Sequence, residues 1–227
     1  MSDFHWSVRK GSALGRFSDG LVVQGGTSGL LHLWACRASS RRVPTPDFAL
    51  LGPLAAACAS EGVRRDTGII SWLHWPNLVT IDGRVVARTS LSLTQPPGPD
   101  FKARVVFEVL VNCFAKRPAS FPPGLQATSI LEALGVEIDV DLLRDKVLHA
   151  LDWYFAEWER GMHRKLVERI EPTISWLGSD VRVRTTDAKV LKGKAEGLDD
   201  RGSLLLERRG GALAVQAESV ELVTAVK

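Results

Sequence analysis

The stretch SWLHWPNLVTIDGRVVART, residues 71–89, decides the fold. Two short runs of β-forming residues flank Asp82-Gly83, and Asp-Gly in that setting is a strong signal for a tight hairpin turn. Residues 79–81 and 84–87 are therefore expected to pair as antiparallel strands. Pro76 has no backbone donor and favours an extended conformation at the residue before it. We expect His74, Trp75 and Asn77 to project from this rigid strand entry.

Patterns on both sides of the hairpin predict further strands and helices. Strands are expected over residues 4–9, 21–24, 30–36 and 103–114, which are alternating or β-branched and apolar. Helical spacing of apolar residues predicts helices over 47–65, 129–134 and 139–169, with Asp47 as a cap and Gly161 as a possible break. A turn is expected around residues 25–29. In the 30–36 strand, alternation separates Leu31 from His32, and either face could line a pocket.

The last fifty residues change character. Short β-forming runs at 181–185, 190–198, 203–208 and 212–222 are separated by turn residues. Short strands at this spacing are typical of a small β-barrel.

The composition describes an ordinary globular chain of 227 residues, 45% hydrophobic and 24% charged, with a net charge of +3. Its basic residues are scattered, which argues against a nucleic-acid partner. The longest apolar run, residues 49–59, is too short to span a bilayer, so no membrane partner is expected. The three cysteines, Cys36, Cys58 and Cys113, lack metal-ligand spacing and fit a reducing cytoplasm. We expect no bound structural metal.

Several motifs resemble the biotin–protein ligases over nearly the whole chain. HWPNLVTIDGRVVA resembles the family's KWPND and DGRK signature, and FPPGLQATSI resembles its FPPEL segment. Residues 193–207 keep the pattern GxAxGxDxxGxLLLE almost intact. The resemblance implies an α+β fold, with a mixed, mainly antiparallel sheet flanked by helices as in class II synthetases and biotin–lipoate ligases. It also implies a ligase-like domain at residues 1–176 and an SH3-like β-barrel at 177–227, without a preceding DNA-binding domain.

The family joins biotin to ATP, with magnesium, and passes the biotinyl group to a lysine of a biotin carboxyl carrier protein. By resemblance these would be the cofactors and the partner, and a homodimer is a further possibility. The implied substrate contacts are Gly29, Leu31, Trp75, Asn77, Ala87 and Asn112. His74 stands in place of the family lysine and would be the catalytic candidate.

The chain departs from the family where the chemistry needs positive charge. GGTSG replaces the arginine-rich GRGRxGR loop, and Leu78 replaces the aspartate of KWPND. In the family's GxGxNxN strand the glycines become Val106 and Glu108. Histidine with its ordinary pKa is mostly neutral at pH 7 and does not replace a lysine charge. Arg88 and Arg16 are the candidates to restore that charge.

Three functions remain open at this point. The first is a biotin–protein ligase with impaired or altered activity, which the whole-chain resemblance favours. The second is a non-catalytic relative that acts as a ligand-binding or regulatory module, which the missing charges favour. The third and weaker alternative is a relative of the lipoate-type acyltransferases, because those enzymes share the catalytic fold.

Overall fold

The computed structural model describes residues 7–10, 19–25, 29–39, 45–95, 103–114, 121 and 125–226. Its main feature is a seven-stranded sheet in the order β1-β2-β3-β7-β6-β5-β4. The strands are β1 Ser7–Lys10, β2 Leu21–Gly25, β3 Leu30–Ala38, β4 Trp72–His74, β5 Leu78–Ile81, β6 Arg84–Gln95 and β7 Arg104–Asn112. The β1–β2 pair is parallel and every other pair is antiparallel.

The predicted hairpin is confirmed. Strands β5 and β6 pair antiparallel and are joined by Asp82 and Gly83, whose φ angles are 49° and 73°. Positive φ at both central residues is what a two-residue hairpin turn with the native strand twist requires, and Asn, Asp and Gly adopt it most readily. The local sequence signal was sufficient here because the turn and the strand ends that flank it follow one another directly in the sequence.

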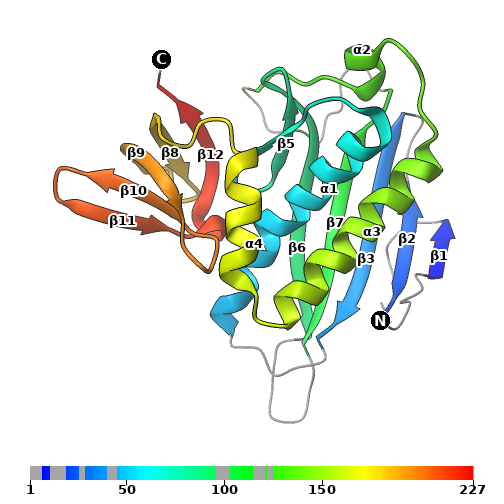
Figure 1. Ribbon diagram of the computed structural model, residues 1–227, viewed down its shortest axis with the longest axis horizontal. Helices are drawn as coiled ribbons and strands as arrows, with labels where there is room; N and C mark the ends of the chain where they lie inside the picture. Colours follow the sequence, from blue (N-terminus) through cyan, green and yellow to red (C-terminus); the bar gives the residue numbers. More distant parts are fainter. Residues whose placement is uncertain are drawn as a thin grey trace.

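Helices cover one face of this sheet and run in front of it in Figure 1. The helical segments of this part are η1 Thr45–Leu50, α1 Leu51–Thr67, α2 Ile130–Leu134, α3 Val140–Glu159, α4 His163–Ile170 and η2 Glu171–Thr173. Helices α1 and α3 pack against each other and against the central strands. The predicted break at Gly161 is confirmed, because Gly161 has φ 76° between α3 and α4.

One predicted cap is wrong. The α-helix begins later than expected, after the 3-10 turn η1, and its N-cap is Leu50 without a side-chain cap. Asp47 lies in η1, and its backbone carbonyl accepts a hydrogen bond from Trp158 Nε1 at 3.0 Å. Gly52-Pro53 falls in the first turn of α1, where a missing proline N–H leaves no helical bond unmade.

The C-terminal part is a separate five-stranded antiparallel sheet in the order β11-β10-β9-β8-β12. Its elements are β8 Asp180–Thr185, β9 Val190–Leu198, β10 Leu204–Arg208, β11 Gly211–Val215, η3 Ala217–Ser219 and β12 Val220–Ala225. In Figure 1 it lies beside the end of the helix layer, on the left. The α+β fold with a small C-terminal β unit is thus confirmed.

Candidate functional site

The two faces of the seven-stranded sheet differ in chemistry. Phe107 of β7 faces the helices, since its ring meets that of Phe155 in α3 at 6.0 Å. Register therefore places Leu31 and Ala87 on the same side, and both are fully buried. We call the opposite side the second face; it is the side away from the layer of α1, α3 and α4 in Figure 1. In the 30–36 strand His32 therefore points to the second face and Leu31 to the helices; which of these faces lines a pocket stays a prediction.

Four polar side chains meet on the second face, and we call them the second-face cluster: His32, Arg88, Ser90 and Glu108. Ser90 and Glu108 are opposite each other on β6 and β7, and His32 is diagonal to Glu108 on β3. Glu108 Oε1 lies 2.6 Å from His32 Nε2, and Ser90 Oγ donates to Glu108 Oε2 at 2.6 Å. The carboxylate is thus held at both oxygens.

The environment keeps Glu108 ionised. Burial raises its pKa, but the hydrogen bonds from Ser90 and His32 and the positive charge of Arg88 outweigh burial, so the pKa lies below the ordinary value. About a quarter of the side chain remains exposed (27%). A negative charge therefore stands in the middle of the second face at neutral pH.

Arg88 is the predicted charge-restoring residue that lies at this site. It sits on β6, opposite Leu78 on one side and Leu110 on the other. Its guanidinium forms no hydrogen bond or ion pair with another residue that the structure describes, and its field acts on Glu108. The other candidate, Arg16, lies outside the described residues.

His74 is held by the C-terminal sheet. Its Nε2 lies 2.8 Å from the carbonyl oxygen of Val223 in β12, and its ring meets Trp176 edge-on at 6.2 Å. Burial lowers the pKa of His74, partly offset by the bond to that carbonyl. The imidazole is neutral at pH 7 and supplies no substitute for a lysine charge. A catalytic role for His74 stays a prediction that these contacts do not favour.

Three predicted substrate contacts are buried in the structure. Leu31 and Ala87 belong to the core under the helices, on the side opposite the second face. Trp75 is fully buried as well, and its indole Nε1 donates to the Gly202 carbonyl at 2.9 Å. The enclosed ring presents no open face for stacking. Substrate contacts by these three residues stay predictions, which this burial does not favour.

The other predicted substrate contacts form hydrogen bonds within the fold. The Asn77 carbonyl accepts the Thr89 N–H at 2.8 Å. Buried Asn112 donates from Nδ2 to the Thr128 carbonyl at 2.7 Å. Gly29 has φ 96°, and its carbonyl accepts from the amides of Cys113 and Phe114. Their contacts to a substrate stay predictions.

Sequence reasoning did not name Ser90. It offered His32 only as one of two alternative pocket-facing positions and noted Glu108 only as a filled glycine position. The available signal was alternation: even-numbered residues of β3, β6 and β7 share one face once the strands are paired. Among the described residues, no group of three or more His, Cys, Asp or Glu side chains is placed to hold a metal ion. No described helix is long and apolar enough to cross a membrane.

Comparison with known proteins gives a consistent family. A family model described as the biotin protein ligase C terminal domain matches residues 177–222. The bifunctional ligase/repressor BirA of Bacillus subtilis is 28% identical over 181 residues, which are 78% of this chain and 53% of BirA. The same protein of Bacillus spizizenii matches to the same extent. The chain thus spans about half the length of the curated relatives it matches.

Solved structures agree in fold. The biotin protein ligase of Aquifex aeolicus superimposes with a TM-score of 0.76 at 18% identity, covering 94% of this chain and 91% of that one. A biotin protein ligase-like protein of unknown function from Silicibacter sp. TM1040 also reaches 0.76, at 14% identity, with 94% and 95% covered. By its hairpin motif, its C-terminal sheet and these comparisons, the chain resembles the biotin–protein ligases in sequence and shares their fold.

Proposed function

We propose that this chain is a biotin–protein ligase-like protein that binds a small ligand on the second face and in which ATP-dependent biotin transfer is strongly reduced. One observation carries the proposal. Glu108, at a position where the family has glycine, is ionised and held by His32 and Ser90 in the middle of that face. We also propose that residues 1–176 form the ligand-binding domain and residues 177–227 a separate folding unit.

The reason is electrostatic. Formation of biotinyl-AMP brings a carboxylate against a phosphate, so the site must offset two negative charges. Preorganised donors of this kind are usually the largest catalytic contribution, and losing one costs roughly a hundredfold to a thousandfold in rate. Here the positive charge of Arg88 is offset by the negative charge of Glu108, and His74 is neutral. The described residues therefore do not fit the anionic groups of ATP well.

Similarity still supports a ligand of the family type. The Aquifex aeolicus ligase has been solved with biotin and ATP, and it shares the fold of this chain. If transfer persists at a low rate, the acceptor would be a lysine of a biotin carrier protein. The ionised Glu108 also supports the alternative of a non-catalytic binding module. The impaired ligase and the binding module differ only in whether biotinyl-AMP forms.

Biotin- and ATP-dependent pyrophosphate exchange tests the proposal directly. We expect exchange far below that of a working biotin–protein ligase assayed beside it. Exchange at an ordinary enzyme rate would overturn the proposal. Exchange that is slow but above background favours an impaired ligase, whereas none favours the binding module.

Glu108→Gln tests the electrostatic reason. It keeps the size of the side chain and removes its charge, so ATP should bind roughly tenfold tighter by calorimetry at an effective dielectric near 20. Glu137→Gln is the matched control, because Glu137 is exposed, follows α2 and is not part of the second-face cluster. Equal ATP affinity in wild type and Glu108→Gln would show that this carboxylate does not limit binding.

A further inference from the structure

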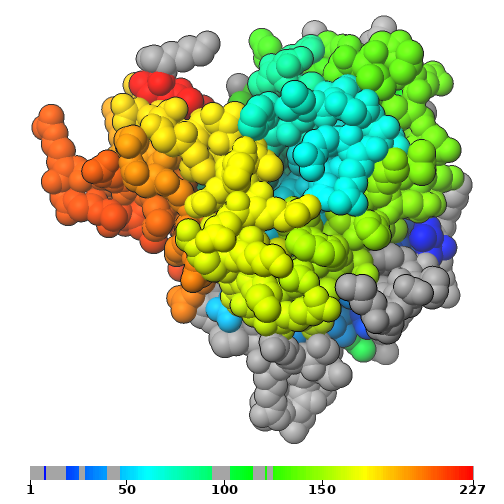
Figure 2. Space-filling view, viewed as in Figure 1, coloured from blue at the N-terminus to red at the C-terminus, as the bar shows by residue number. Residues whose placement is uncertain are grey.

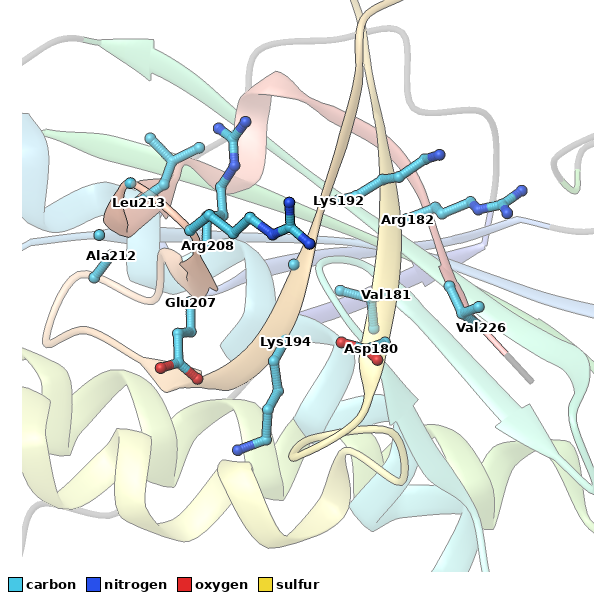
Figure 3. A pocket seen from close by; sticks show the side chains of 14 residues that line it. Asp180, Val181, Arg182, Lys192, Lys194, Glu207, Arg208, Ala212, Leu213 and Val226 are labelled. Atoms are coloured by element: carbon cyan, nitrogen blue, oxygen red, sulfur yellow. The ribbon is translucent and has the colours of Figure 1, made fainter.

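A second concave surface lies on the C-terminal sheet, away from the second face. It is an open groove of about 1090 Å³ formed by β8, β9, β10, β11 and the turn at residues 209–210. Figure 3 shows the side chains that line it. Strands β10 and β11 project from the body of the molecule in the view of Figure 2, so a partner can approach them.

The groove is rich in positive charge. Its charged lining consists of five basic and two acidic side chains: Arg182, Lys192, Lys194, Arg208, Arg209, Asp180 and Glu207. All seven are exposed. The excess of three positive charges equals the formal net charge of the entire chain, +3.

Two of these cations oppose each other directly. Arg182 of β8 and Lys192 of β9 are cross-strand partners, an arrangement that destabilises a sheet. Neither forms an ion pair with another described residue. Their neighbours are neutralised, since Lys194 pairs with Glu196 at 2.6 Å and Arg184 with Glu221 at 2.8 Å. A bound anionic group would relieve the uncompensated repulsion.

The groove also borders an edge of the sheet. In the described part of the chain, β11 pairs with β10 alone, so its other side has backbone donors and acceptors without a strand partner. Gly210 and Gly211 line the groove next to this edge, with open space where a Cβ would stand. The backbone of this turn is therefore open to a bound peptide.

We propose that this groove binds an extended acidic segment of a partner protein, which lies across the groove against the backbone at Gly210 and Gly211 and places carboxylates beside Arg182 and Lys192. Protein is favoured over nucleic acid for two reasons. The lining contains no aromatic side chain for base stacking, and Asp180 and Glu207 would repel a continuous row of phosphates. The site is independent of the ligand proposed for the second face.

The test uses the full chain and a fluorescein-labelled ten-residue peptide of alternating Glu and Val. Fluorescence anisotropy should show saturable binding that weakens with salt, and the same peptide with Lys for Glu should not bind. The double variant Arg182→Gln, Lys192→Gln should bind about fivefold more weakly or worse. Arg64→Gln is the matched control, because Arg64 is exposed on α1 and distant from the groove. It should bind as wild type does.

Hydrogen exchange locates the peptide. The amides of Gly210 and Gly211 should exchange more slowly in the complex. Unchanged affinity in the double variant, or unchanged exchange at these two amides, contradicts the proposal. An oligonucleotide of equal charge that binds more tightly than the peptide also contradicts it and assigns the groove to nucleic acid. If the double variant unfolds, Arg208→Gln with Arg209→Gln in the exposed turn applies the same test.

Discussion

At the scale of single residues, the second-face cluster depends on contacts between residues that are distant in the sequence. Glu108 is recognisable in the sequence as a departure from a glycine, but its partners are 76 and 18 residues away, on β3 and β6. Only the strand register brings His32 and Ser90 to it. His74 shows the reverse case, since the motif implies an active-site role and the fold gives it a contact with Val223.

His74 should make stability depend on pH. Its folded-state pKa lies below 6.5, so below pH 6.5 the unfolded chain binds a proton that the folded chain does not. Stability contributed by the neutral ring is present at higher pH and is lost as the pH falls from 6.5 towards the folded pKa. The loss is at most about 1.4 kcal/mol per pH unit for one group. Urea unfolding between pH 7.5 and 5.5 measures it.

The matched variants for this measurement are His74→Gln and His149→Gln. Glutamine at position 74 does not titrate, so the decline in stability on acidification should become shallower. His149 is exposed on α3, and its replacement should leave the wild-type slope unchanged. The same slope in wild type and His74→Gln would show that this histidine is not responsible.

At the scale of elements, the sequence predicted what is local. The β5–β6 hairpin, the β7 strand and the helical stripe of α3 all carry their own periodicity, and all are confirmed. The order of the strands could not be predicted from the sequence. Strand β7 pairs with β3, which is far from it along the chain, and no local pattern indicates that pairing. The packing distance between helices was equally hidden, because it depends on residues such as Gly62 of α1 and Val147 of α3.

Gly62 lets α1 and α3 approach closely. A Cβ at this position would lie 2.4 Å from Val147 Cγ2 and 3.1 Å from the Val147 backbone. Gly62→Ala should therefore destabilise the protein by about 1–3 kcal/mol, the usual cost of overpacking a core. Denaturant unfolding with circular dichroism measures the change.

Gly52→Ala is the control within the same helix. Nothing lies within 4 Å of a Cβ at Gly52, so alanine there should be neutral or stabilising by up to about 1 kcal/mol. The two substitutions make the same chemical change in α1, and only their surroundings differ. Equal effects would mean that the contact with Val147 does not control the helix spacing.

At the scale of the whole molecule, the strongest sequence motifs join its two sheets. Gly202 of the C-terminal motif has φ 76°, and a Cβ there would approach Leu50 Cδ1 to 3.0 Å. A Cβ at Gly197 would lie 2.7 Å from Glu171 Oε1, the atom that accepts the amide of Leu198. These glycines permit close contact between the C-terminal sheet and the helix layer. The glycines of the C-terminal motif therefore serve the contact between the C-terminal sheet and the helix layer, which we call the joint. This role does not depend on the charges of the second-face cluster.

Trp75 connects the two most recognisable motifs, because its indole donates to the Gly202 carbonyl at 2.9 Å inside the joint. Trp75→Phe removes this donor and leaves a buried carbonyl without its partner, which costs about 1–3 kcal/mol. We expect lower unfolding stability and faster amide exchange around residues 199–204, while the rest of the C-terminal sheet keeps its protection. Trp72→Phe is the control, because Trp72 is half-exposed on β4. If Trp75→Phe leaves exchange at 199–204 unchanged, this hydrogen bond does not hold the two sheets together, and the fit of the glycines alone must do so.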